Sequence, residues 1–322
     1  TTNYDYDALD QITSIVDSLS GTFDFTYDNL SRRTSITGPG GLTKAYTHDN
    51  ADRLISLINQ INGNPLESLN YSYDKASNRT QKTDNQGTHD YSYDLIDQLV
   101  SATNQNESFS YDPAGNWLNV NGQTYAANEA NQIISNNTGL NVSYDNNGNI
   151  TSKSENGITW TYTWNSENQL ISATSSEGTT VNYSYDALGR RASMTSSGST
   201  LQFIYDNQEV LLDYQDGQLV KRYTNGPNID EHLALIDVVI GASYFYHMDS
   251  LGSATAITDV SGNIVETYDF SVYGVPTIRD NQEIVVEKSM IGNRYLHSGR
   301  EFDSLTGFYY HRARYRDPSL GI

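Results

Sequence analysis

The stretch NYSYDALGRR, residues 182–191, carries the pattern that most of this chain repeats. Its first half alternates like a β-strand, which places the rings of Tyr183 and Tyr185 on one face. Asp186 is expected to start a turn, because its carboxylate can accept backbone N–H groups two residues further on. Gly189 permits the positive φ that closes such turns, after which the chain returns. The stretch therefore predicts one β-hairpin.

Variants of this stretch recur at a period of about 20 residues, which indicates one supersecondary unit copied many times. Most copies have an aromatic-Asp step, a turn and a strand rich in Thr, Ser, Val and Ile, residue types that suit a pleated surface. The series includes a copy at Tyr205 and a degenerate one at Tyr125. Pairs such as Asn62-Gly63 mark the opposite turns. The structural motif residues predicted from the copies are Tyr27, Asp28, Tyr73, Asp74, Tyr93, Asp94, Tyr111, Asp112, Tyr144, Asp145, Tyr185, Asp186, Gly189 and Arg190.

Composition narrows the class of protein. The 322 residues carry a net charge of −20, which argues against nucleic-acid binding through phosphate neutralisation. There are 25 Tyr against 8 Phe and 3 Trp, so the core must use amphipathic rings. The absence of Cys removes disulfides, thiolate metal sites and cysteine nucleophiles. No stretch reaches the roughly 18 apolar residues of a membrane span, and we expect none.

Metal and catalytic motifs are weak throughout. The segment 145–149 is superficially similar to a calcium loop, but its Gly falls one place early and no Glu follows at the needed distance. The repeated Asp therefore favours a turn role, and we predict no metal site and no cofactor. The six His show no zinc spacing, and neither a nucleophile elbow nor a phosphate loop is present. His247 begins an H-x-D-x-x-G turn and is expected to be structural.

The end of the chain carries a more specific signature, GRE-x-D-x-x-TG-x-YY-x-RARY-x-DPSLG, over residues 299–321. This signature resembles the core domain that follows the repeats in RHS/YD-repeat proteins, a family that includes bacterial polymorphic toxins, insecticidal toxin C components and teneurins. The resemblance covers essentially the whole chain. The residues that carry the core signature are Gly299, Arg300, Glu301, Asp303, Gly307, Tyr309, Tyr310, Arg312, Arg314, Asp317, Pro318 and Gly321.

The resemblance implies an all-β fold, in which antiparallel β-hairpins wind as a spiral shell and a core region plugs one end. We expect the hairpin shell over residues 1–222 and the core-like region over residues 223–322. The number of hairpins is too small for a large closed container, so one or two turns of spiral plus the plug are predicted. The chain starts in mid-pattern, and we take it for a piece of a longer polypeptide.

The resemblance also bears on catalysis. In toxin-type members the core domain cleaves its own chain with an arginine and two aspartates, and the arginine corresponds to Arg314. Both aspartates would lie beyond Ile322, so this chain is expected to be no enzyme. Asp317 reads as a turn residue before Pro318. We expect Arg300, Arg312 and Arg314 to pair with Glu301, Asp303 or carboxylates of the shell.

Two functions remain open from the sequence. The first is a structural shell that encloses and presents a toxin or effector covalently linked after residue 322, together with other shell or secretion components. The second is a cell-surface adhesion module that binds glycans or a protein receptor through its Tyr-rich face. Both predict a bacterial protein that is secreted or displayed at the cell surface.

Overall fold

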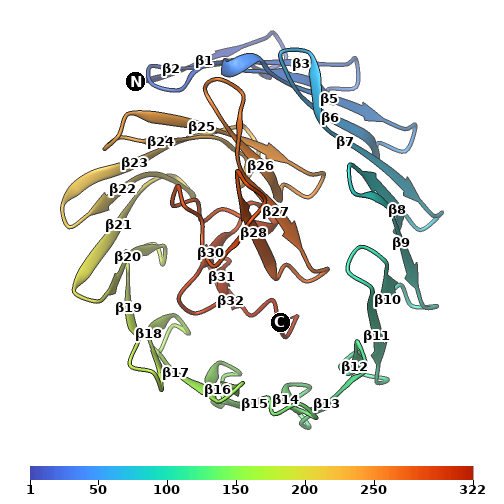
Figure 1. Cartoon of the computed structure of the whole chain (residues 1–322), viewed down its shortest axis with the longest axis vertical. Coiled ribbons are helices and arrows are strands. Elements are labelled where there is room, and N and C mark those ends of the chain that lie inside the picture. The colour runs from blue at the N-terminus through green and yellow to red at the C-terminus, as the bar shows by residue number, and fades with distance from the viewer. Residues whose placement is uncertain (322) are drawn as a thin grey trace.

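The computed structural model describes residues 1–321 and consists almost entirely of antiparallel β-strands. One sheet holds 29 strands, each paired with its neighbour along the chain, and a separate sheet holds three. The large sheet curls through one full turn and then continues inside its own beginning (Figure 1). The predicted fold class, a spiral of antiparallel hairpins, is confirmed, and so is the expectation of one or two turns.

The first 23 strands form the curved wall of the spiral (Figure 1). A single short 3₁₀ turn, η1 (Pro39–Gly41), interrupts them. The wall strands are β1 (Thr2–Tyr6), β2 (Ile12–Asp17), β3 (Gly21–Tyr27), β4 (Arg33–Thr37), β5 (Leu42–His48), β6 (Leu54–Ile61), β7 (Asn64–Tyr73), β8 (Arg79–Asp84), β9 (Gly87–Tyr93), β10 (Leu99–Ala102), β11 (Glu107–Tyr111), β12 (Trp117–Val120), β13 (Gln123–Ala127), β14 (Ile133–Asn136), β15 (Asn141–Tyr144), β16 (Ile150–Glu155), β17 (Ile158–Trp164), β18 (Leu170–Ser175), β19 (Thr180–Tyr185), β20 (Arg191–Ser196), β21 (Ser199–Asp206), β22 (Glu209–Gln215) and β23 (Gln218–Asn225).

Each motif Asp caps the turn that follows its strand. Asp186 Oδ1 accepts the N–H of Leu188 at 2.9 Å and that of Arg190 at 3.0 Å. The residue three places after the Asp takes a positive φ, which is 77° at Gly189. Most wall copies place Asp, Asn or Ser there instead, residue types that tolerate this region. The same double cap is made by Asp28, Asp94, Asp112 and Asp145, and Asp74 accepts the N–H of Asn78.

Most motif aromatic residues tie their hairpin to the preceding one. The Tyr185 hydroxyl donates to the Leu170 carbonyl at 2.7 Å, and the Trp164 indole N–H donates to the Ile150 carbonyl at 2.7 Å. The rings are partly buried, so their hydroxyl and N–H groups need a hydrogen-bond partner within the protein. The carbonyl of the preceding hairpin supplies it. The equivalent bond is made by Tyr27, Tyr73, Tyr93, Tyr111, Tyr144 and Tyr205.

A second connection runs along the rim of turns. The Arg53 guanidinium binds Asp49 of its own turn and donates to the Asp74 carbonyl of the next turn at 2.8 Å. Other copies place Arg or Asn at this position and reach forward in the same way. Adjacent hairpins are therefore joined in both directions along the chain, as expected for a repeat array.

Two copies depart from the pattern predicted for them. Asp206 lies inside β21 and pairs with Glu209 across a two-residue turn, so the carboxylate after Tyr205 caps nothing. In the degenerate copy the turn is capped by Asn128, which accepts the N–H groups of Ala130 and Gln132. Ala127 therefore takes the place of the motif aromatic residue, and Tyr125 lies two residues before it.

After β23 the sheet continues as an inner layer beneath the first strands of the wall (Figure 1). A shared core joins the two layers, in which Phe23 and Phe25 of the wall pack with Leu233, Ile236 and Phe245. The rings of Phe23 and Phe245 meet edge to face at 6.1 Å. The inner strands are β24 (His232–Asp237), β25 (Ala242–Met248), β26 (Ala254–Asp259), β27 (Ile264–Phe270), β28 (Pro276–Asp280) and β29 (Val285–Val286).

The last part of the chain, residues 295–321, lies in the interior of the spiral and is called the plug here (Figure 1). It contains a 3₁₀ turn, η2 (His297–Gly299), and the small sheet of β30 (Glu301–Asp303), β31 (Phe308–Tyr310) and β32 (Tyr315–Arg316). The predicted boundary between the shell (residues 1–222) and the core-like region (residues 223–322) falls inside β23, where the large sheet is continuous. This division into two domains stays a prediction.

We predict that removing one motif hydroxyl weakens the wall modestly. Tyr144→Phe deletes the bond to the Ile133 carbonyl, which is 2.7 Å long, and leaves the ring in place. The free energy of unfolding should fall by about 0.5–1.5 kcal/mol, measured by urea denaturation. Tyr6→Phe is the control, because Tyr6 is 57% exposed. Equal effects of the two substitutions would contradict the proposed role of the hydroxyl.

Candidate functional site

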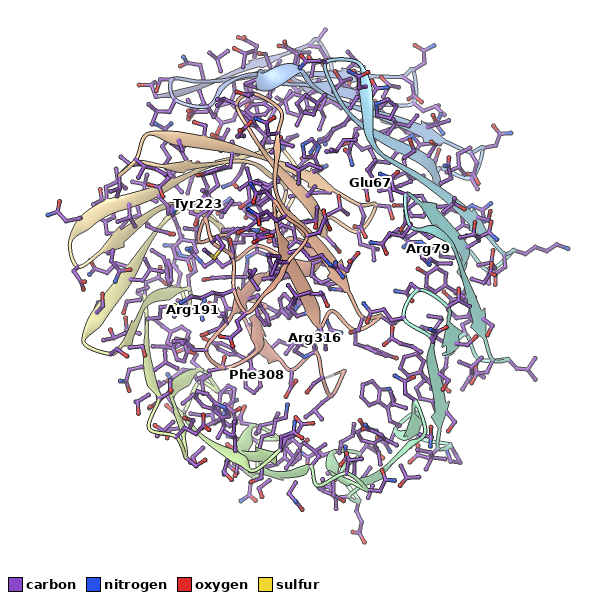
Figure 2. All side chains as sticks on the ribbon, in the orientation of Figure 1. Glu67, Arg79, Arg191, Tyr223, Phe308 and Arg316 are labelled. Atoms are coloured by element: carbon purple, nitrogen blue, oxygen red, sulfur yellow. The ribbon has the colours of Figure 1, made fainter. Side chains whose placement is uncertain are left out.

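The plug is held to the wall through Arg191, a fully buried side chain at the start of β20. Its guanidinium forms an ion pair with Glu301 of the plug at 2.6 Å, and Asp303 lies 3.8 Å away. The backbone N–H of Arg191 donates to the Tyr310 hydroxyl at 2.9 Å, and the Tyr310 ring lies 4.7 Å from the guanidinium carbon. Figure 2 places Arg191 on the inner side of the wall, facing the plug.

The charged network extends further through a second arginine of the same interior. Arg294 Nε lies 2.6 Å from Glu301, and Arg294 also binds Asp213 of β22 in a bidentate manner. The Tyr223 hydroxyl donates to Asp213 at 2.8 Å and accepts from Arg294 at 3.0 Å. Wall strands β20, β22 and β23 thus meet the plug in one hydrogen-bonded cluster, called the interior network here.

Burial and charge act in opposite directions on the interior network. Burial alone would raise the pKa of Glu301, but the guanidinium groups of Arg191 and Arg294 hold that pKa below its usual value. Burial and then the Asp303 carboxylate raise the pKa of Tyr183, whose hydroxyl donates to Asp303. The buried arginines remain charged, because their carboxylate partners outweigh the cost of burial.

The other plug residues of β30 and β31 have structural contacts. Asp303 accepts the N–H of Leu305 at 3.0 Å, and Gly307 follows in the same turn with a φ of 76°. The Tyr309 hydroxyl donates to the Gly274 carbonyl at 2.9 Å. These residues position the small sheet inside the spiral.

A second ionic cluster lies around Asp230, in the loop between β23 and β24. Arg300 lies 3.0 Å from this carboxylate and Arg312 lies 2.7 Å from it, while Arg312 also binds Glu209 at 2.8 Å. The arginines thus pair with carboxylates of the preceding hairpins, and Arg300 does not pair with its neighbour Glu301. Gly299 has a φ of 65°, and a Cβ there would lie 2.3 Å from the Asp230 carbonyl oxygen. Only glycine fits this contact.

The end of the plug reaches the far wall. Asp317 accepts the N–H of Ser319 at 2.9 Å, as a turn residue does, and also binds Lys153 Nζ at 2.7 Å. Pro318 is buried, and Leu320 packs into a wall core that contains Trp117. Gly321 has a φ of 68°, and a Cβ there would lie 2.5 Å from the Trp117 ring.

Arg314, the candidate catalytic residue, lies apart from the interior network. Its side chain is exposed in the loop between β31 and β32, and its carbonyl accepts the His311 N–H at 2.8 Å. It lines a cavity of about 360 Å³ together with Arg190 and Arg312. The ion pair expected for Arg314 was therefore wrong: among residues 1–321, Arg300 and Arg312 pair with carboxylates, whereas the exposed Arg314 side chain pairs with none.

A large cavity lies between the wall and the inner layer. It has a volume of about 920 Å³ and is lined by β7–β10 on one side and by β26–β28 and the loops between them on the other. Arg79, which lines it, projects from the wall towards the inner hairpins (Figure 2). Within residues 1–321, no three His, Asp or Glu side chains gather as a metal site requires. The described part of the chain also has no helix long and apolar enough to cross a membrane.

Sequence reasoning missed the wall side of the interior network. Asp213 and Tyr223 belong to strands without a motif, and Arg191 ends the repeated stretch as the first residue of a returning strand, where no partner is indicated. The available signal was strand alternation, since a charged residue at an inward position must find a partner. Strand alternation can predict that a charged side chain is buried, but it cannot predict the partner, because Glu301 and Arg294 lie far along the chain.

Hairpin units that wind into a hollow spiral around an internal plug define a class of β-shell. Within that class, the Teneurin YD-shell family model matches residues 48–286 and the RHS Repeat model matches residues 6–43. The chain belongs to the YD-shell family, and the resemblance seen in the sequence is confirmed.

Similar proteins include the tRNA nuclease WapA of Bacillus subtilis and the tRNA3(Ser)-specific nuclease WapA of Bacillus spizizenii. Each is 32% identical over 245 residues, which cover 71% of this chain and 10% of the relative. The chain therefore spans about a tenth of the length of these curated relatives. The crystal structure of TcdB2-TccC3 has the same fold, with a TM-score of 0.72 and 16% identity over 99% of this chain and 19% of that one.

We predict that two adjacent arginines differ sharply in their effect on stability. Arg191→Ala leaves Glu301 buried beside one arginine instead of two, and should cost about 3–5 kcal/mol. Arg190→Ala removes a partly exposed pair with Asp186 and should cost about 0–1 kcal/mol. Chemical denaturation of both variants tests this, and similar losses would show that Arg191 does not hold the plug.

We also predict that acid destabilises the fold from near pH 6.5 downwards. Burial lowers the pKa of His232 to about 4 and that of His247 to about 3. The unfolded chain, with His pKa values of about 6.5, then binds protons first, so stability is lost as the pH falls below that value. Glu301, with a lowered pKa, adds a loss only below about pH 4.3.

Denaturation curves between pH 7.5 and pH 4.5 would measure this loss. His247→Asn should reduce the pH dependence, because one buried group no longer titrates. An unchanged pH dependence in that variant would contradict the assignment.

Proposed function

We propose that this chain forms the wall and plug of a container that encloses and presents an effector segment attached after residue 322. Ile322 itself lies outside the described residues. The observation that carries this proposal is the position of the plug, which lies within the spiral and reaches the far wall at Leu320. A segment that follows the plug would then start from the interior of the shell.

The interior network supports a lasting closure in this proposal. Arg191 and Arg294 are desolvated, so breaking their bonds to Glu301 would strand buried charge. The plug would therefore remain bound to the wall for as long as the wall is folded. The cavity of about 920 Å³ offers interior space with mixed polar and aromatic walls.

The relatives suggest which effector to test first. WapA proteins are named as tRNA nucleases, and this chain matches a tenth of their length. We infer that a nuclease is the first effector class to test, and that the repeats themselves serve as a structural casing. The net charge of −20 argues against the casing itself binding tRNA. We propose that the protein is bacterial and exported, to the medium or to the cell surface.

Protease protection tests enclosure. A natural chain that extends past residue 322 would be treated with protease, and the following segment would be detected by mass spectrometry. We expect that segment to survive a dose that digests the same segment expressed alone. Equal digestion rates would overturn the proposal, since an enclosed segment is inaccessible.

We further predict a role for Arg314 in self-cleavage. Similarity to toxin-type members places Arg314 at the arginine of their autoproteolytic site. In a natural chain that includes the two aspartates after residue 322, Arg314→Ala should abolish the cleavage product on a denaturing gel. Arg190→Ala is the control, because Arg190 lines the same cavity outside the signature. Unchanged cleavage in the Arg314 variant would dismiss this role.

A further inference from the structure

Three side chains with complementary chemistry lie in one row across the wall. Lys44 of β5 is directly opposite Asn59 of β6, and Asn59 is directly opposite Glu67 of β7. Residues directly opposite in antiparallel strands share a face, with Cβ atoms about 4.5–5.5 Å apart. Side chains that end in an amine, a carboxamide and a carboxyl group therefore start from neighbouring positions on three consecutive strands.

The row faces the interior. Asn59 is fully buried and Lys44 is 3% exposed. Asn59 Nδ2 lies 3.2 Å from Glu67 Oε2, while Asn59 Oδ1 is buried with no hydrogen-bond partner. An unpaired buried carbonyl lowers the free energy of unfolding, so Asn59 in this packed layer calls for an explanation.

The amine of Lys44 has the properties of a nucleophile. Within residues 1–321, no salt bridge forms at its Nζ; the Glu231 carboxylate attracts this amine but is itself paired with Arg33, whose charge repels it. Burial lowers the pKa of Lys44 to about 8, so a useful fraction of the amine is uncharged near neutral pH. A buried amine that makes no ion pair of its own carries a high cost as long as it stays charged.

Glu67 has the properties of a general acid. Burial raises the pKa of its carboxyl group, which favours the protonated form. Thr255 Oγ1 donates to Glu67 Oε2 at 2.7 Å and fixes its orientation beside Asn59. Rotation of the Asn59 amide by half a turn would bring Oδ1 to the position where a protonated Glu67 can donate to it.

We propose that Lys44 and Asn59 react to form an intramolecular isopeptide bond, with Glu67 as the catalytic acid. No such bond is part of the shell function proposed above, and either could hold without the other.

The step balances without any added reagent. The lone pair of Lys44 Nζ attacks Asn59 Cγ, and Glu67 donates a proton to the carbonyl oxygen as the tetrahedral intermediate forms. The Cγ–Nδ2 bond then breaks and the carbonyl re-forms. Nδ2 leaves as ammonia with one hydrogen taken from Lys44, and Glu67 regains its proton. The products are a secondary amide and ammonia, and no oxidant or reductant is needed.

The bond would strengthen a chain that has no disulfide. It would link β5 to β6 and close the loop from residue 44 to residue 59, which constrains the unfolded chain as a disulfide does. It would also convert the buried amine of Lys44 and the buried carboxamide of Asn59, both unfavourable in a packed layer, into one uncharged secondary amide. The linked strands lie over the inner layer, where Asn59 approaches the Met248 carbonyl.

Intact-mass spectrometry of the purified wild-type protein tests the proposal directly. We expect a mass lower than the sequence mass by one ammonia molecule. Trypsin should then release the peptides 34–53 and 54–75 as one linked species, because a linked Lys44 is not cleaved. Separate peptides from folded protein, with cleavage after Lys44, would overturn the proposal.

Variants separate this reaction from ammonia loss at Asn-Gly turns such as Asn62-Gly63. Lys44→Met keeps a long side chain and should abolish the linked species, whereas succinimide formation would persist. Glu67→Gln keeps the shape and should leave most of the protein unlinked. Lys75→Ala, at an exposed turn, is the control and should remain fully linked. A linked peptide pair that survives Lys44→Met would also overturn the assignment.

Discussion

The hydrogen bond from most motif aromatic residues to the preceding hairpin is the interaction on which the spiral depends. A hairpin cannot bury its apolar face alone, and much of the wall has no second sheet behind it (Figure 1). Tyr93 and Tyr144, for example, cover their own hairpins with the ring and bind the previous hairpin with the hydroxyl. The high tyrosine content follows from this demand, since Phe would supply the ring without the bond.

The turn caps set where each such bond can form. Because Asp186 fixes the turn by accepting two N–H groups, the register of the returning strand is fixed as well. A slip of one residue would point Tyr183 to solvent and the flanking polar residues inwards. The turn cap and the hydrogen bond of the motif aromatic residue therefore specify the same geometry. Such agreement between local and global preferences favours a single fold.

This logic explains what the sequence could predict. The turn residues, the strand alternation and the period are local, so the hairpins followed from residues such as Asp28 and Gly189. The winding of the hairpins into a spiral shell was implied by the family resemblance. The copy at Tyr205 shows the limit, because its Asp206 has the motif letters but lies within a longer strand. The partners of Arg191 and Asp213 are Glu301 in the plug and Arg294 just before it, far along the chain, and no local pattern connects them. The ion pairs of Arg300 and Arg312 were expected, but their common partner Asp230 was not.

Polar residues at inward positions determine where the plug binds the wall, which the periodic pattern of the repeats does not specify. A wall built only from apolar inward residues would accept any apolar surface, whereas Arg191 accepts a plug that presents carboxylates at one place. Buried ion pairs add little net stability, so their contribution here is to select one seating of the plug. Lys44 and Asn59 occupy equivalent inward positions without an ionic partner. Their cost must be offset differently. The proposed covalent bond removes the charge of the amine, and the carbonyl of the new amide can accept a hydrogen bond from protonated Glu67.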